Sequence, residues 1–445
     1  MVPFENCPVT LLLVFIVVSK SHVTASKAAA VPLPYGTFQG FNVGNLTKFL
    51  GILFAHVGWF EAPNAPTPLY GVQNATDFGP ACPQQAVPPL LGSSTLGAYP
   101  SISEDCGFEI GNSRDQDVVP LLERSIETRE PMIIVTPNYC LTLFGFLGGR
   151  EVGSAEISNL GLRDRLVNCQ RSCLQRFTPF NLWVQKEEQR GGQSTGTVST
   201  VLLSLSNKQN SNTLFHGPFM VSGSPTKSAS PADGQADHDS LVAVNNCTAS
   251  ADTLGCLRRI PLEVLMAAVN ETPNILSYQS LSLLLHPHID RDVLMEDPMV
   301  SVACGSYALI LLMTGDCDDE GTTNAGFLDY MHNNYLPPSL QADIAQIGTL
   351  YPEDPAQGDL VFLGPRRFLL EHASATQDAR SWLSKLGKNT PIVGAFHTSD
   401  TGVWFLTNVK NRVAGRCRWN QALKESGTAL GEGRYIALST YLGRR

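Results

Sequence analysis

The sequence predicts an α/β fold in which helices flank a mostly parallel central sheet. Short β-branched runs alternate with helix-like stretches along the 445 residues, without a repeat period, a heptad or a low-complexity tract. Several apolar runs are continuous and end in a polar cluster, as parallel strands buried on both faces do. We expect strands at residues 132–136, 219–221, 308–313 and 392–396.

The composition predicts one globular domain. Hydrophobic residues make up 43% of the chain and charged residues 16%, which is enough apolar material for a sizeable core. No Gly/Ser-type linker separates two cores. Residues 207–301 are richer in Leu, Pro and Asn with helix-like spacing, and we interpret them as insertions over the sheet within a single domain of residues 26–445.

The N-terminal segment predicts export. The apolar run at residues 9–18 is too short to span a bilayer, and Val23 and Ala25 supply the small residues of a cleavage site. We therefore expect a signal peptide at residues 1–25 and an extracellular, secreted protein. The residues before the run lack the usual basic charge, so the alternative interpretation is a buried N-terminal strand.

Secretion would permit disulfides and glycosylation. N-x-[ST] sequons predict glycan-bearing surface positions at Asn45, Asn74, Asn246 and Asn270. The net charge of −9 argues against nucleic acid or an anionic membrane as the main partner.

The run Gly192-Gln193-Ser194-Thr195-Gly196 has the G-x-S-x-G pattern of a nucleophile elbow. Flanking glycines allow the sharp turn from strand to helix, and residues 197–206 suit the helix that follows. The pattern alone also fits a plain loop. An acyl-transfer serine needs a base and an acid that orients the base, in the chain order serine, acid, histidine. Glu320 and His397 follow Ser194 in that order, each after an expected strand.

Several blocks resemble type-B carboxylesterases and lipases, especially the fungal extracellular ones. The block at residues 315–322 (GDCDDEGT) resembles the acid loop of that family. Further matches are the blocks EDC at 104–106, PNY at 137–139, GFL at 145–147, NLGLRD at 159–164 and GAFHTSD at 394–400. The resemblance implies an α/β-hydrolase fold with a sheet flanked by helices, and hydrolysis of small-molecule esters or lipids without metal or cofactor.

The same resemblance assigns roles to individual residues. Ser194 is the expected nucleophile, His397 the general base and Glu320 the carboxylate that holds the imidazole tautomer, so that an acyl-enzyme forms. The backbone N–H groups of Thr195 and Gly107 match the oxyanion hole of the family. The implied disulfides pair Cys82 with Cys106 and Cys247 with Cys256. The stretch at residues 83–105 is either a lid over an apolar site or a structural surface loop.

Two other clusters carry weaker interpretations. The acidic run at residues 316–320 lacks the spacing of a Ca²⁺ loop, so we expect no cation site there. His286 and His288 are compatible with a metal pair, but a solvated loop is favoured.

The chain departs from the family pattern at two strands. The block that ends in Cys106 runs directly into Gly107, without the central strand that carries the oxyanion loop. The strand before Ser194 is replaced by the charged run at residues 184–191, which does not suit a strand buried on both faces. We therefore expect an incomplete sheet. The competing hypothesis is an impaired or inactive relative that acts as a binding or adhesion-type protein, although all three triad residues are present.

Overall fold

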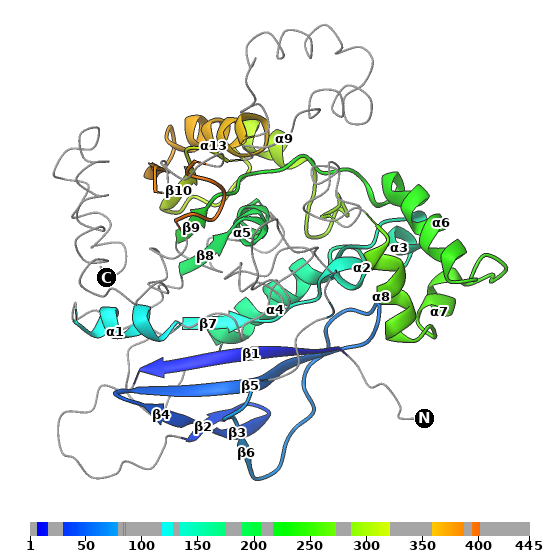
Figure 1. Ribbon diagram of the computed structural model, residues 1–445, viewed down its shortest axis with the longest axis horizontal. Coiled ribbons are helices and arrows are strands. Elements are labelled where there is room, and N and C mark those ends of the chain that lie inside the picture. Colours follow the sequence, from blue (N-terminus) through cyan, green and yellow to red (C-terminus); the bar gives the residue numbers. More distant parts are fainter. Residues whose placement is uncertain are drawn as a thin grey trace, which may run out of the picture.

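The computed structural model describes residues 7–16, 30–78, 83, 85, 118–127, 134–174, 189–205, 217–272, 286–320, 358–386 and 394–400. Its described strands form two four-stranded sheets and one three-stranded sheet, with helices packed around them (Figure 1). One cluster of buried apolar side chains joins these layers. It includes Ile52, Leu166, Leu202, Met220 and Leu369.

The first four-stranded sheet is antiparallel and has the order β4-β5-β1-β7. Its strands are β1 (Cys7–Ile16), β4 (Phe41–Val43), β5 (Leu46–Val57) and β7 (Ile134–Pro137). Strand β1 pairs with β5 along one side and with β7 along the other, and it lies beside β5 in Figure 1. The expected strand at residues 132–136 thus corresponds to β7.

Strand β1 consists of residues that we expect in a signal peptide. In the structure this apolar run forms a strand, and an N-terminal strand is the alternative to a signal peptide that the sequence leaves open. Cleavage after Ala25 would remove β1 and leave β5 and β7 without their shared partner. The signal peptide stays a prediction, and the N-terminus of the mature protein decides it.

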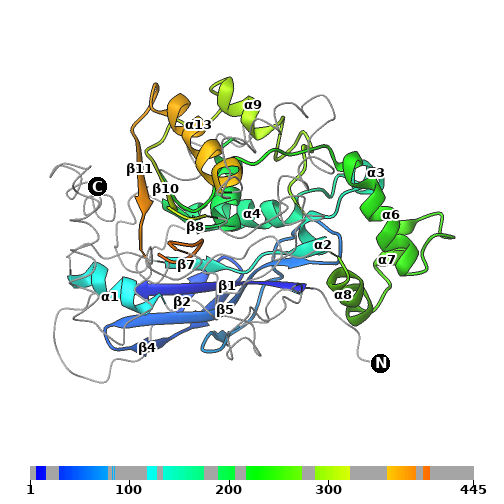
Figure 2. The same cartoon turned by 45° about the horizontal axis from the view of Figure 1, so that its top comes forward.

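The second four-stranded sheet is parallel and has the order β11-β10-β9-β8. Its strands are β8 (Gln189–Gln193), β9 (Gly217–Val221), β10 (Leu312–Cys317) and β11 (Ala379–Ser384). Figure 2 shows β10 and β11 side by side. Strand β9 contains the expected strand at 219–221, whereas β10 begins four residues later than expected. Strand β11 was not expected.

The strand before Ser194 does form, so part of our expectation for residues 184–191 is wrong. Residues 189–191 begin β8, which pairs with β9 and is last in the order of its sheet. Of the charged residues at 184–191, only Arg190 falls within the bounds of β8, so the strand itself carries little of the charge that would be costly to bury. No strand in the described ranges joins β7 to β8, and the incomplete sheet stays a prediction because residues 86–117 and 175–188 lie outside the described part of the chain.

A small sheet and the helices complete the fold. The small sheet has the order β2-β3-β6, with β2 (Ala30–Leu33), β3 (Gly36–Gln39) and β6 (Val72–Asn74). The helices are α1 (Val119–Glu127), α2 (Thr142–Phe146), α3 (Arg150–Ser154), α4 (Leu160–Leu174), α5 (Thr195–Ser204), α6 (Gln235–Val244), α7 (Thr253–Leu257), α8 (Leu262–Asn270), α9 (Pro298–Ala303) and α13 (Gly364–Ala373). A 3₁₀ turn, η4 (Pro231–Gly234), precedes α6, and a π-helical turn, η7 (Asp359–Leu363), precedes α13.

The helices that matter for the site are α5 and α13. Helix α5 packs on β8 and β9, and α13 packs on β10 and β11. Helices α6 to α9 lie within the stretch that we interpret as insertions over the sheet. Within the described ranges, no helix is both long enough and apolar enough to span a membrane.

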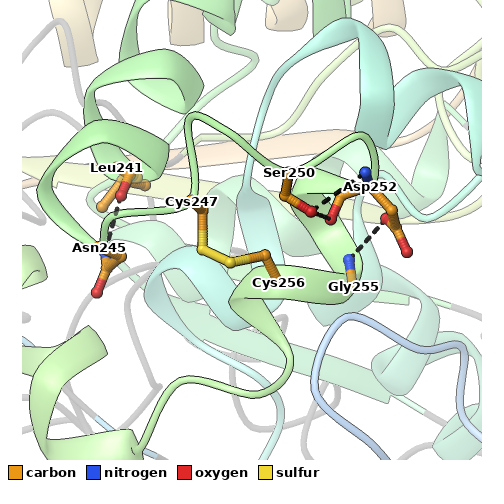
Figure 3. The surroundings of a disulfide bond; sticks show 7 residues. All are labelled: Leu241, Asn245, Cys247, Ser250, Asp252, Gly255 and Cys256. Carbon is orange, nitrogen blue, oxygen red and sulfur yellow. Dashed lines mark hydrogen bonds between the residues drawn. A yellow bond between two sulfur atoms is a disulfide. The ribbon is translucent and has the colours of Figure 1, made fainter.

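The disulfide between Cys247 and Cys256 is present, with the two Cα atoms 5.8 Å apart. It joins the loop that follows α6 to α7 (Figure 3). The Asp252 side chain caps α7 by accepting a hydrogen bond from the backbone N–H of Gly255 at 2.7 Å. Cys82 and Cys106, the other expected pair, lie outside the described residues.

His288 is a buried structural residue, so our expectation of a solvated loop there is wrong. It is 1% exposed, and its backbone N–H and C=O both bond to the side chain of Asn159, at 2.8 and 2.7 Å. Burial lowers the pKa of His288 to about 4, which keeps its ring neutral near pH 7. No group of three or more His, Cys, Asp or Glu side chains suited to a metal ion occurs among the described residues.

Candidate active site

Ser194 lies at a sharp turn between β8 and α5. Its backbone has φ 56° and ψ −124°, which is unusual for a residue other than glycine. The Ser194 N–H donates to the carbonyl of Val221 on β9 at 2.8 Å, and the Ser194 C=O accepts from Val198 in the first turn of α5 at 3.0 Å. The strand, the strained serine and the helix have the geometry that a nucleophile elbow requires.

Gly192 and Thr197 hold this turn together. A Cβ atom on Gly192 would lie 2.3 Å from the carbonyl carbon of Gly196, so only glycine fits there. The buried Thr197 hydroxyl donates toward the carbonyls of Gly192 and Val221, at 2.5 and 2.8 Å, and accepts from the Val221 N–H at 2.9 Å. Strand β9 is thereby bound to the elbow by both backbone and side chain.

Glu320 and His397 are in direct contact. The Nδ1 atom of His397 forms a short hydrogen bond with Oε2 of Glu320, and the backbone N–H of Cys317 donates to Oε1 of Glu320 at 2.8 Å. Glu320 is 1% exposed, whereas the His397 side chain is 28% exposed. Because an ionised carboxylate only accepts hydrogen bonds, this contact fixes the proton of neutral His397 on Nδ1.

The charges of these two residues stabilise each other. Burial alone would raise the pKa of Glu320, but the His397 charge and hydrogen bonds from His397, Ser222 and Cys317 outweigh it and hold that pKa below its usual value. Burial opposes the charged form of His397, yet the Glu320 carboxylate raises the pKa of His397 above its usual value. Asp400 and Asp316 raise it further. His397 is therefore a stronger base than an isolated histidine.

The other ring nitrogen of His397 faces Gln193. Nε2 of His397 lies 3.3 Å from Nε2 of Gln193, the residue before Ser194. With the proton on Nδ1, the Gln193 amide is the donor in this contact. In the described part of the chain, no hydrogen bond joins the Ser194 hydroxyl to His397. The structure thus brings His397 to the elbow but places Gln193 in the position that Ser194 must take for proton transfer.

A second set of contacts joins the loops that carry the acid and the base. The Asp319 carboxylate accepts from the Ala395 N–H at 2.6 Å, and the Asp319 N–H donates to the Ala395 carbonyl at 3.1 Å. The ring of Phe362, from η7, lies 4.9 Å from the ring of His397. Gly358, where η7 begins, would place a Cβ atom 2.1 Å from the Glu320 carbonyl oxygen. The acid loop, the histidine loop and η7 therefore pack as one unit.

Of the two residues expected to form the oxyanion hole, only Thr195 lies in the described part of the chain. Thr195 is the first residue of α5, where backbone N–H groups have no partner inside the helix and favour negative charge. Gly107 lies outside the described residues, as do residues 86–105 of the expected lid. The four sequon residues Asn45, Asn74, Asn246 and Asn270 are all exposed, as glycan acceptors need to be.

Sequence reasoning missed several residues of the site. Gln193 was part of the motif, but nothing in the pattern showed that its amide meets His397. Ser222 follows β9 and has φ 52°, a strained backbone that no local motif indicates. Phe362 and Arg366 come from a stretch without recognisable family blocks. Only the packing of Phe362 against the His397 ring and the pairing of Arg366 with Asp316 place them near the site.

The chain is similar to known carboxylesterases and lipases. The model of the carboxylesterase family matches residues 27–108 and 191–345. A secreted triacylglycerol lipase of Gibberella zeae is 30% identical over 66% of this chain and 57% of the lipase, and lipase 5 of Diutina rugosa is 28% identical over 91% and 85%. The chain thus spans little more than half of the first of these relatives.

The fold also matches a solved structure. The crystal structure of Aspergillus niger EstA superposes with a TM-score of 0.71 over 85% of this chain and 82% of that one, at 18% sequence identity. At that identity the likeness concerns the fold, which is the α/β-hydrolase fold with a divided sheet. The family match covers more than half of the residues, on both sides of the elbow. The chain therefore belongs to the carboxylesterase family.

Proposed function

We propose that this protein is a secreted carboxylic ester hydrolase that cleaves lipophilic esters through a Ser194-His397-Glu320 triad. The observation that carries the proposal is the Glu320–His397 hydrogen bond beside the strained Ser194 turn. The named lipases among the relatives support a small-molecule ester or a lipid as the substrate. We expect neither a metal nor a cofactor to take part.

The proposed reaction uses the site as follows. His397 Nε2 takes the proton of the Ser194 hydroxyl while Ser194 Oγ attacks the ester carbonyl, and Glu320 stabilises the imidazolium that forms. The Thr195 N–H at the start of α5 and the Gly107 N–H donate to the developing oxyanion. The imidazolium then protonates the departing alcohol, and water cleaves the acyl-enzyme in the same way. Before the first step, His397 must exchange its Gln193 contact for one to Ser194.

The test is covalent labelling with a fluorophosphonate, which reacts with an activated serine. We expect the wild-type chain to be labelled and to hydrolyse a p-nitrophenyl ester, and we expect Ser194→Ala to lose both. Ser199→Ala is a matched control, because Ser199 is a buried serine of α5 that lies away from the elbow. Labelling that survives in Ser194→Ala would overturn the assignment of the nucleophile.

The second candidate is a binding protein of the adhesion type. The observations that favour it are the divided sheet and the contact of His397 Nε2 with Gln193 in place of Ser194. Folded wild-type protein that is not labelled at any pH between 6 and 9 would support this function, because 6 to 9 is roughly the range in which neutral His397 can activate a serine.

Secretion is part of the proposal. Several of the relatives are named secreted lipases, and the sequons and the Cys247–Cys256 disulfide suit an oxidising compartment. We expect export from a eukaryotic host, a mature N-terminus at Ser26 and glycans on the four sequon residues. Intact mass after enzymatic deglycosylation measures the N-terminus. Recovery of the exported protein with residues 7–16 attached would instead support retention of β1.

A further inference from the structure

A buried ion pair lies beneath the acid loop. Asp316, on β10, is 0% exposed, and its Oδ2 lies 2.6 Å from Nε of Arg366 on α13. Arg366 is 6% exposed and also donates to the carbonyl of Trp382 on β11 at 3.1 Å. Because a buried carboxylate without a partner is costly, Arg366 is what allows an acid in a strand that is buried throughout.

The position of this pair links it to the triad. Asp316 directly precedes Cys317, whose N–H holds Glu320, and the carbonyl of Gly315 on its other side accepts from the Ser222 N–H at 2.7 Å. Arg366 binds the end of β10 to β11 and α13. Movement of the Asp316 backbone would therefore move the donor that orients Glu320.

The charge of Asp316 also links the ion pair to the triad. The groups that act on His397 are Glu320, Asp400 and Asp316, and all three favour its protonated form. Burial raises the pKa of Asp316 to about 7, with Arg366 opposing and Glu320 reinforcing this rise. Arg366 is the cation that faces Asp316 from α13, whereas Lys385 lies 3.8 Å from Asp318 with its side chain 60% exposed.

We infer that Asp316 and Arg366 form a positioning pair for the triad, which fixes the strand end that carries Glu320. This inference rests on the proposed function. The two residues touch no substrate atom. They act through Glu320 and His397.

The decisive variant is Asp316→Asn, and the measurement does not need an active enzyme. The experiment uses a Ser194→Ala background and diethyl pyrocarbonate, which modifies neutral imidazole. Peptide mass spectrometry measures the rate of modification of His397 alone at each pH, and the pH at which this rate is half of its maximum is the midpoint. We expect the midpoint of this reaction to shift to lower pH, because Asp316 favours the protonated form of His397 and its backbone holds the donor to Glu320. Asp318→Asn removes the same charge at a partly exposed site and is expected to leave the midpoint in place. An unchanged midpoint in Asp316→Asn would overturn the inference.

Arg366→Lys tests the positioning role, and it also keeps the inference testable if Asp316→Asn does not fold. This variant keeps the charge but loses the planar guanidinium that reaches both Asp316 and Trp382. We expect kcat/KM for a p-nitrophenyl ester to fall about tenfold, because Glu320 is less well held. Unchanged kcat/KM would count against the pair. If the wild-type chain is not labelled by a fluorophosphonate, the proposed function is contradicted. The titration of His397 in the Ser194→Ala background still tests the inference in that case.

Discussion

Glu320→Gln is expected to lower kcat/KM for a p-nitrophenyl ester by about 10⁴-fold, the scale found when a triad acid is replaced by its amide. The amide has nearly the same shape and can still accept from the Cys317 N–H, so the fold should be retained. What it loses is the charge that holds the proton of His397 on Nδ1 and stabilises the imidazolium.

The variant also has a pH signature. Because the Glu320 carboxylate raises the pKa of His397, its removal lowers that pKa. The residual activity should therefore persist to lower pH than the activity of the wild-type chain, since the acid limb of kcat/KM reports the base of the free enzyme. Initial rates between pH 4 and 9, roughly the span over which a histidine base titrates, measure both effects.

Asp318→Asn is the matched control for Glu320→Gln, since it makes the corresponding carboxylate-to-amide change in the same loop. The Asp318 side chain is 25% exposed and pairs only loosely with Lys385, at 3.8 Å. We expect kcat/KM within about twofold of wild type, because surface ion pairs contribute little. A Glu320→Gln variant that retained a tenth of the wild-type rate would show that another group orients His397.

The sequence predicted the parts of the site that depend on local turns and on chain order. The glycines around Ser194 predicted the elbow because a close backbone approach leaves a local signature, as the steric contact at Gly192 shows. The order of Glu320 and His397 predicted their meeting, because both follow strands or loops at one edge of a parallel sheet.

Features set by distant contacts were not predictable. The polar run that ends in β8 forms a strand through its pairing with β9, and a pairing partner is not readable from a single strand. His288 sits in a polar stretch yet is buried, because Asn159, 129 residues away, satisfies its backbone. Residues 7–16 are equally suited to a leader and a strand, since both need a short apolar run.

Gly192→Ala is expected to disrupt the elbow itself. The added methyl group would lie 2.3 Å from the carbonyl carbon of Gly196 and 2.5 Å from the Thr197 nitrogen. Both are backbone atoms of the first turn of α5, so no side chain can move aside to make room. Separating β8 from α5 would also break the bond from the Thr197 hydroxyl to the Gly192 carbonyl. We expect a loss of about 3 kcal/mol or more in the free energy of unfolding, at the upper end of overpacking costs.

Gly191→Ala separates this steric effect from the general effect of replacing a glycine. A Cβ atom at Gly191 would meet the Phe219 carbonyl oxygen at 3.7 Å, which is an ordinary contact. We expect the control to be as stable as wild type or slightly more stable, because alanine restricts the unfolded chain. Urea unfolding and the rate of fluorophosphonate labelling compare the two variants. Equal stability and labelling in the two variants would mean that β8 and α5 do not approach as closely as the Ser194 turn requires. The expected difference would show that glycine is needed at Gly192, where the backbones of strand and helix meet, and not at Gly191.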